Sequence, residues 1–441
     1  MRFPDIALEA PRVLLPRADI PTETWAVIAC DQHTSFPGYW EDVARHIGPA
    51  PSTLHLVFPE AYLGAADHRQ RIADIRAHMA DYVAGDVLQE LPPGFVLTDR
   101  QTPHVASRRG LLVALDLEQY SYDADARTLI RTTEGTVVSR LAPRIEVRRG
   151  APLEVPHIMV LIDDPEQTVI EPLFERSLPL LYDTALMLGG GRVRGWHVRD
   201  APLIEQVVAA LRRLLATDSS GGPDAPMLYA MGDGNHSFAT AQAVWQELKD
   251  SNGGLTGIED HAARYALVEL VNLHDSGLVF EPIHRALFGC ELEVLLTSLQ
   301  AGCPALAREI SVETCTTEAS WEQARRIASD RSRHRLPFVA GNRKGVVVLH
   351  EPTHSLPVVS LQEFLTDFER THAPMAVDYI HGEEAVRRLG GMKGNIGLLA
   401  EVIDKHALFP TIRRDGPLPR KSFSLGEAEE KRYYMECRRI A

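Results

Sequence analysis

The sequence predicts an α/β or α+β fold built on a mixed β-sheet. Short apolar runs, typical of buried strands, alternate with longer segments that carry apolar residues at helical spacing. Residues 264–273 and 278–285 are two such runs joined by a short turn, which is typical of a hairpin. Because a hairpin is antiparallel whereas strands separated by helices are commonly parallel, we expect both kinds of pairing in the sheet.

The length of 441 residues exceeds what one hydrophobic core ordinarily supports, so two domains are expected. We predict a core domain over residues 1–287 and a smaller α/β lobe over residues 288–441. The tail 415–424 of the lobe is expected to return to the core domain's site. Residues 1–24 are rich in proline and charge and are interpreted as an extended arm on the surface.

The individual elements follow from the length and spacing of the apolar runs. In the core domain, the predicted strands are 25–30, 111–117, 157–162 and 226–230, and the predicted helices are 39–48, 65–90, 171–188 and 201–215. In the lobe, the predicted helices are 291–301, 318–330, 361–372, 382–389 and 394–407, and the predicted strands are 336–340 and 344–350.

Composition narrows the classes of function. With 60 acidic and 46 basic residues the formal charge is −14, so nucleic acid is not expected as a partner. The five cysteines are scattered and form no C-x-x-C pair, which indicates reduced thiols in a cytoplasm. The N-terminus lacks the apolar core of a signal peptide, and no apolar run reaches the roughly 18 residues of a membrane span. We therefore expect a cytoplasmic protein that acts on a small molecule.

The stretch Asp233-Gly-Asn-His-Ser237 is the strongest candidate site. It follows a predicted strand and precedes apolar residues at helical spacing, so Gly234 would form a turn and Asn235 or Ser237 would cap a helix. Backbone N–H groups at a helix start favour bound phosphate, and Asp233 and His236 add acid–base or metal chemistry. An ordinary Asp-Gly turn with a structural histidine explains the same residues, and the spacing leaves both interpretations open.

Other polar clusters stand at the ends of predicted elements. Asp31 follows the first buried strand, where open α/β sheets bind ligands. Arginines at positions 140, 144 and 148 recur every four residues, and Pro143 prevents their helix from starting before residue 142. Such arginines either bind phosphate oxygens or pair with acidic neighbours. The remaining candidates are Glu134 in a turn, His284 and Arg285 at a strand end, and Arg420 and Lys421 in a basic turn.

Five motifs together resemble the domain of unknown function 1015 family, whose members are often described as partition-protein-like. They are ACDQHTS (29–35), TEGTVVSR (133–140), GDGNHS (232–237), EPIHR (281–285) and LPRKSF (418–423). The motifs span almost the whole chain in the family's order.

The turn is also distantly similar to the phosphate-binding turn of the partition-protein/sulfiredoxin superfamily. That resemblance implies a partition-protein/sulfiredoxin-like core, and the superfamily includes nucleotide-binding switches, sulfinic acid repair enzymes and free-serine kinases. Asn235 stands where sulfiredoxins need a reactive cysteine, which argues against sulfinic acid repair. Ser237 stands where an arginine is typical, so the phosphate-binding charge must come from Arg140, Arg144, Arg285 or the pair Arg420–Lys421.

The resemblance implies a phosphotransferase that acts on a small hydroxyl metabolite, such as the amino acid serine, with ATP or ADP and Mg²⁺. Asp233 or Glu134 would accept the hydroxyl proton, and His236 with the amides of the turn would hold a phosphate. Asp31 would help to bind the metal. The alternatives are a phosphomonoester hydrolase that uses the same residues and a non-catalytic, nucleotide-binding regulator of the partition-protein type. The chain lacks the H-E-x-x-H, G-x-S-x-G and G-x-G-x-x-G motifs of other enzyme classes.

Overall fold

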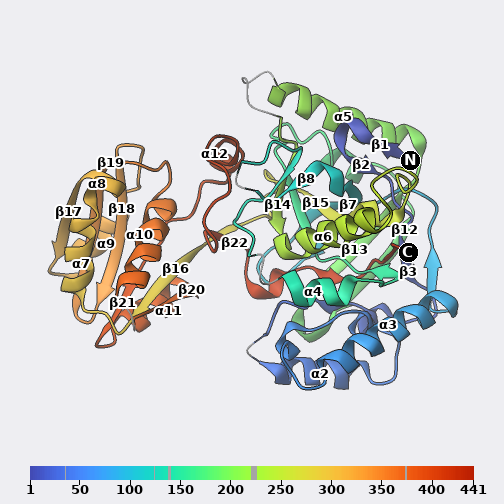
Figure 1. The fold of residues 1–441 in the computed structure, drawn as a ribbon, viewed down its shortest axis with the longest axis horizontal. Coiled ribbons are helices and arrows are strands. Elements are labelled where there is room, and N and C mark those ends of the chain that lie inside the picture. The colour runs from blue at the N-terminus through green and yellow to red at the C-terminus, as the bar shows by residue number, and fades with distance from the viewer. Residues whose placement is uncertain (35, 124, 138–140, 220–225, 373–374) are drawn as a thin grey trace. The chain divides into compact units, whose positions relative to one another are not determined.

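The computed structural model describes residues 1–34, 36–123, 125–137, 141–219, 226–372 and 375–441. The chain forms two compact units (Figure 1). The first comprises Met1–Val279 together with Leu425–Ala441, and the second comprises Phe280–Ser424.

The boundary between the units differs from the expected boundary at residue 287. Strand β16 (Phe280–Phe288) pairs with strands of the second unit, whereas β15 (Tyr265–Asn272) pairs only with strands of the first. The predicted hairpin between these two runs is therefore wrong, because each strand belongs to a different sheet. The expected tail 415–424 belongs to the second unit, and residues 425–441 form the segment that returns to the first.

A large mixed sheet organises the first unit. Strand β15 is parallel to β11 and antiparallel to β7, and β11 is in turn antiparallel to β14, which confirms the predicted fold class. The strand order is β12-β13-β6-β7-β15-β11-β14-β9-β8, and β2 joins β1 to β7. The bounds are β1 (Arg2–Phe3), β2 (Leu8–Glu9), β6 (Phe95–Gln101), β7 (Arg108–Asp116), β8 (Tyr120–Ser121), β9 (Ile130–Arg131), β11 (Met159–Ile162), β12 (Leu180–Leu186), β13 (Gly191–Val198) and β14 (Tyr229–Asp233).

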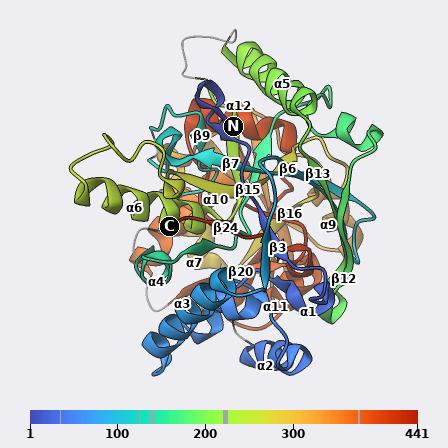
Figure 2. The same cartoon turned by 90° about the vertical axis from the view of Figure 1, so that its right-hand side faces the viewer.

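Helices cover both faces of this sheet (Figures 1 and 2). Successive side chains of a strand point to opposite faces, so Leu111 and Val113 of β7 pack with the cluster that contains α5 and α6, and Leu112 packs with the cluster that contains α2 and α3. The helices of this unit are α1 (Thr22–Trp25), α2 (Pro37–Ile47), α3 (His68–Ala84), α4 (Leu141–Arg148), α5 (Ala201–Ser219) and α6 (Asn235–Ser251).

Two predicted features of the first unit are wrong. Residues 180–186 form β12, because burial alternates at Tyr182, Thr184 and Leu186 as in a strand, and residues 171–175 and 187–189 form short 3-10 helices. The N-terminal residues do not form a surface arm. Ile6 and Leu8 are fully buried, β2 joins the large sheet, and β3 (Leu14–Pro16) pairs with β5 (Leu88–Glu90).

The second unit has its own sheet. Its strands are antiparallel in the order β17-β19-β18-β21-β16-β20, and β22 also pairs with β16. Residues 395–398 form a strand at the start of the predicted helix 394–407, so that prediction is wrong; Ile396 and Leu398 bury their side chains in the core. The other elements are β17 (Ala307–Cys315), β18 (Arg333–Ala340), β19 (Arg343–Pro352), β20 (Ala376–His381), β21 (Asn395–Leu398), β22 (Phe423–Leu425), α7 (Leu292–Ala301), α8 (Cys303–Leu306), α9 (Glu318–Arg325), α10 (Pro357–Thr371), α11 (Glu383–Gly390) and α12 (Leu408–Asp415). Among the residues that the structure describes, no helix combines the length and hydrophobicity that a bilayer crossing requires.

The C-terminal segment is fastened into the first unit by strand pairing and by buried charges. Two short pairs hold it: β23 (Tyr433–Tyr434) with β4 (Val27–Ile28), and β24 (Arg438–Arg439) with β10 (Leu153–Glu154). The guanidinium of Arg432 lies 2.9 Å from Glu269 Oε2 and 2.6 Å from Glu436 Oε2. Burial alone would raise the pKa of Glu269, but the Arg432 charge outweighs it and holds that pKa below its usual value.

Replacing Arg432 by methionine is expected to lower the free energy of unfolding of the first unit by about 3–5 kcal/mol, because two buried carboxylates lose their counter-charge. Chemical denaturation measures the change. Arg439→Met is the matched control in the same segment, since the Arg439 side chain is exposed and forms an exposed ion pair with Glu90. Its expected cost is below about 1 kcal/mol. Equal costs for the two variants would contradict the role given to Arg432.

Candidate functional site

The predicted turn is confirmed in its backbone but not in its cap. Strand β14 ends at Asp233, Gly234 has a φ of 76°, and α6 begins at Asn235. A side chain at Gly234 would be strained at this φ and would place its Cβ 3.0 Å from the Cα of Ile158. Gly234 itself is the N-cap and no side chain caps the helix, so the predicted capping by Asn235 or Ser237 is wrong.

The segment that contains Glu134 lies beside this turn. The Thr132 hydroxyl is 2.8 Å from Asn235 Oδ1 and 2.6 Å from the carbonyl oxygen of Glu134. The backbone N–H of Val137 donates to His236 Nε2 at 3.4 Å. The TEGTVVSR motif and the turn therefore meet in space. Arg140 lies outside the described residues.

A lysine that the sequence did not single out completes the turn. Lys431 Nζ lies 2.7 Å from Asp233 Oδ2, and the backbone N–H of Gly234 donates to Asp233 Oδ1 at 2.8 Å. Burial alone would raise the pKa of Asp233, but the charge of Lys431 and its hydrogen bond outweigh that effect and hold the pKa below its usual value. Burial would likewise lower the pKa of Lys431, whereas Asp233 and then Asp31 keep it raised. Both groups therefore remain charged at the start of α6.

Asp31 is brought close to the same lysine. It follows β4, and the side-chain amide of Gln32 donates to its Oδ1 at 3.0 Å. Its charge acts on Lys431 and also raises the pKa of Glu60, after the larger effect of burial on that carboxyl. The ACDQHTS and GDGNHS motifs thus contribute to one charged cluster.

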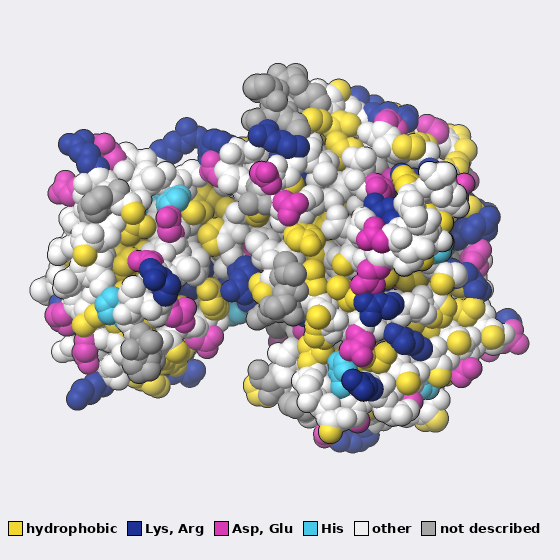
Figure 3. Space-filling view, in the orientation of Figure 1, with side chains coloured by type: hydrophobic (Ala, Val, Ile, Leu, Met, Phe, Trp, Pro, Cys, Tyr) yellow, Lys and Arg dark blue, Asp and Glu magenta, His cyan; other side chains and the backbone are white. Residues whose placement is uncertain are grey.

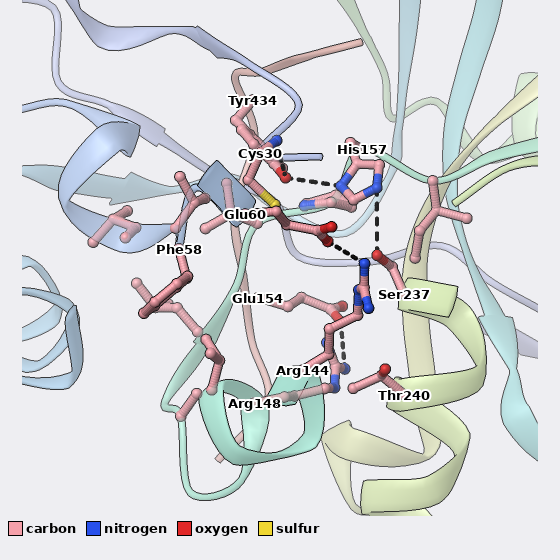
Figure 4. A pocket seen from close by; sticks show the side chains of 18 of the residues that line it. Cys30, Phe58, Glu60, Arg144, Arg148, Glu154, His157, Ser237, Thr240 and Tyr434 are labelled. Atoms are coloured by element: carbon pink, nitrogen blue, oxygen red, sulfur yellow. Dashed lines mark hydrogen bonds and ion pairs between the residues drawn. The ribbon is translucent and has the colours of Figure 1, made fainter. Parts of the chain in front are cut away.

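A cavity of about 140 Å³ opens beside the first turns of α6. Ser237 and Thr240 reach it from α6, Arg144 comes from α4, and Cys30 and Tyr434 come from the paired strands β4 and β23 and the residues that adjoin them (Figure 4). Most of its remaining lining residues are apolar.

A histidine links two hydroxyl groups inside the cavity (Figure 4). His157 Nε2 lies 3.3 Å from Ser237 Oγ, and its Nδ1 lies 2.8 Å from the Tyr434 hydroxyl. The backbone N–H of Cys30 also donates to that hydroxyl, at 3.1 Å. Burial raises the pKa of the Cys30 thiol to about 12, so this sulfur remains protonated and is a poor nucleophile.

The predicted arginines of α4 pair with acidic neighbours, which was one of the two interpretations of their spacing. Arg144 pairs with Glu60, and Arg148 Nη2 lies 2.6 Å from Glu154 Oε2. Burial raises the pKa of Glu60 although Arg144 opposes that shift. Glu154 also binds Arg438 at 2.6 Å, so the C-terminal segment reaches this side of the cavity as well.

Four predicted site residues belong to the second unit. In β16, His284 Nδ1 accepts from the backbone N–H of Ala400 at 3.0 Å, and burial lowers its pKa to about 4. The Arg285 guanidinium is fully buried and lies 4.7 Å from the centre of the Tyr379 ring. Arg420 and Lys421 precede β22. Their convergence on the turn stays a prediction.

Four residues of the site were missed: Glu60, His157, Lys431 and Tyr434. His157 is the first residue of the predicted strand 157–162, but a single histidine at a strand end carries no distinctive spacing. Lys431 lies in an ordinary mixed-charge stretch and reaches the site only through the fold. Among the described residues, no group of three or more histidine, cysteine, aspartate or glutamate side chains is arranged to hold a metal ion.

The surface of the first unit gives no sign of a basic binding face in the view of Figure 3. Lysine and arginine side chains are interspersed there with aspartate and glutamate among the described residues. This agrees with the acidic overall balance.

Several solved structures are similar to this chain, although no curated protein matches it. A conserved hypothetical protein from Pyrococcus furiosus shares 12% identity over 74% of this chain and 90% of its own, with a TM-score of 0.35. A free serine kinase in complex with AMP shares 11% identity over 75% and 91%, with a TM-score of 0.38. SbnI with a C-terminal truncation, from Staphylococcus aureus, shares 9% identity over 71% and 81%, with a TM-score of 0.35.

The comparison with protein families gives a match over residues 14–367, which is most of the chain and includes four of the five motifs. The chain therefore belongs to the family described as "protein of unknown function (DUF1015)".

Proposed function

We propose that this protein is a phosphotransferase that moves a phosphoryl group from a nucleotide, ATP or ADP, to a small hydroxyl metabolite. The phosphates bind at the Asp233–His236 turn, where the first amides of α6 and the Lys431 ammonium provide positive charge. The observation that carries the proposal is the position of Lys431: it supplies, from the C-terminal segment, the cation that Ser237 does not provide in the turn itself. An amino acid such as serine is the acceptor that the resemblance suggests.

The reaction requires a base for the acceptor's proton and a cation for the phosphates. The acceptor oxygen forms a bond to the terminal phosphorus while the bond between that phosphorus and the leaving oxygen of the nucleotide breaks. His157 accepts the hydroxyl proton, because its imidazole lies in the cavity beside the start of α6. Asp233 is the second candidate base. Because Lys431 keeps the pKa of Asp233 low, Asp233 is a weak base, and its role is to hold Lys431 in place.

A magnesium ion at the turn would share Asp233 with Lys431, whose Nζ lies 2.7 Å from Asp233 Oδ2. Mg²⁺ is usually held by one or two carboxylates together with substrate phosphates, and Asp31 and Asp233 both lie close enough to Lys431 to act on its pKa. These two carboxylates would hold it. When bound, the ion neutralises charge on the phosphates.

The pair Ser237–His157 also favours a second candidate, phosphomonoester hydrolysis. A hydroxyl beside an imidazole is an arrangement that activates water or the serine itself. Release of inorganic phosphate from a phosphomonoester in the absence of any acceptor separates this activity from transfer. A regulator that binds nucleotide without turnover is the third possibility, and it gives neither product.

Replacing His157 by glutamine is expected to lower kcat for phosphoryl transfer by about 10²–10⁴-fold, because the base is lost while hydrogen bonding to Tyr434 and Ser237 is retained. Phosphorus NMR of ATP or ADP incubated with a pool of amino acids and other hydroxyl compounds measures the product. His104→Gln is the control, since His104 is half-exposed in the same unit and lies outside the cavity. Unchanged kcat in His157→Gln would remove this residue from the reaction.

Asp233 and Lys431 are expected to be coupled in stability and both required for activity. Asp233→Asn and Lys431→Met should each destabilise the first unit, and the double variant should recover about 0.5–3 kcal/mol of the summed loss. Because the folded pKa of Asp233 is lowered, its contribution is present above the unfolded pKa near 3.9 and fades as the pH falls through the lower, folded pKa. Chemical denaturation of the variants at several pH values measures the coupling free energy between Asp233 and Lys431. In the activity assay, phosphoryl transfer should remain lost in the double variant. Full activity in any of the three variants would disprove a role for the pair in phosphate binding.

A further inference from the structure

The cavity beside α6 has a mainly apolar wall. Leu56, Phe58 and Met79 contribute to it from residues 56–79, and Val147 and Leu153 line it from α4 and from β10. All five pack in or against the hydrophobic cluster that α2 and α3 share with the sheet. A ligand that enters the cavity therefore leaves water and contacts hydrocarbon side chains along most of its length. This transfer favours the binding of a ligand with an apolar body.

The charged side chains of the cavity already have counter-charges. Arg144 pairs with Glu60, and Arg148 pairs with Glu154, which also binds Arg438. A zwitterionic amino acid would need a cation for its carboxylate and an anion for its ammonium, and would have to break one of these pairs to obtain them. Removing one partner of a buried pair is costly, so the cavity favours a neutral ligand.

The size of the cavity sets the size of that ligand. An apolar cavity of about 150 Å³ is large enough to bind benzene. The 140 Å³ available here therefore accommodates one aromatic ring or a branched chain of about five or six carbons. Serine would leave much of this apolar space unfilled.

One end of the cavity is polar and adjoins the turn. His157 lies there between the hydroxyls of Ser237 and Tyr434. A ligand hydroxyl that takes the place of the Ser237 hydroxyl can donate to His157 Nε2 while its oxygen faces the start of α6. A nucleotide base at the same place would keep the acceptor's hydroxyl away from His157.

From these contacts we infer that the acceptor is a neutral alcohol with an apolar body of about six carbons, bound with its hydroxyl at His157. This inference rests on the proposed function in that the hydroxyl is the group that becomes phosphorylated. Binding of the alcohol itself does not require nucleotide. Apolar contacts give the affinity, and the hydrogen bond to His157 fixes the orientation.

Binding of benzyl alcohol and of L-serine to the full chain, each measured without nucleotide by ligand-observed NMR and calorimetry, tests the inference. Benzyl alcohol is expected to bind and serine is not. Val147→Phe, which fills the cavity from α4, should raise the dissociation constant for benzyl alcohol at least tenfold. Ala142→Phe, which adds the same ring to an exposed position of α4, should leave it unchanged. Thermal unfolding of both variants checks that the fold is retained.

The outcomes separate this inference from the proposed phosphotransferase activity. Benzyl alcohol binding that Val147→Phe abolishes supports the cavity as the alcohol site, even if no nucleotide is consumed in any assay. Binding of serine without binding of benzyl alcohol, or equal affinity of the two phenylalanine variants, overturns the inference. In that case phosphorylation of a polar acceptor would leave the proposed activity intact.

Discussion

The ion pair between Lys431 and Asp233 is the contact on which the rest of the site depends. It joins the end of β14 to the C-terminal segment, and it places an ammonium group at the start of α6. Without it, the turn would present a carboxylate alone to an incoming phosphate, which would repel it. With it, the carboxylate is neutralised and the helix start retains a net positive potential.

The C-terminal segment can hold Lys431 in place because its neighbours are anchored on both sides. Arg432 is fixed by Glu269 and Glu436 in the core, and Tyr434 pairs with β4 and contacts His157. A lysine on a free tail would lose side-chain and backbone entropy on every binding event, whereas this one is already ordered. The same segment thus contributes a cation to the turn and a hydroxyl to the cavity. The acidic balance of the chain makes such a locally placed cation more important, since the net charge of −14 repels phosphate from a distance.

The fold class and the turn were predictable because both depend on the spacing of apolar residues and glycine over short stretches of sequence. Gly234, followed by apolar residues at helical intervals, is sufficient to predict a strand, a turn and a helix start. The prediction was wrong where a segment fits both a helix and a strand. Residues 180–186 suit a helix in composition, but their burial alternates as in a strand. The predicted hairpin failed because adjacency in sequence favours pairing, yet β15 and β16 have better partners in separate sheets. Lys431 and His157 could not be found at all, because nothing in the sequence relates residue 431 to residue 233 until the C-terminal segment folds back.

We propose that the start of α6 and Lys431 together bind a phosphate group. A crystal structure of the full chain grown with a non-hydrolysable ATP analogue tests it most directly. In that structure we expect phosphate oxygens within hydrogen-bond distance of Lys431 Nζ and of the first backbone amides of α6. An analogue bound with its phosphates at another place, with the Asp233–Lys431 pair unchanged and the turn empty, would contradict it.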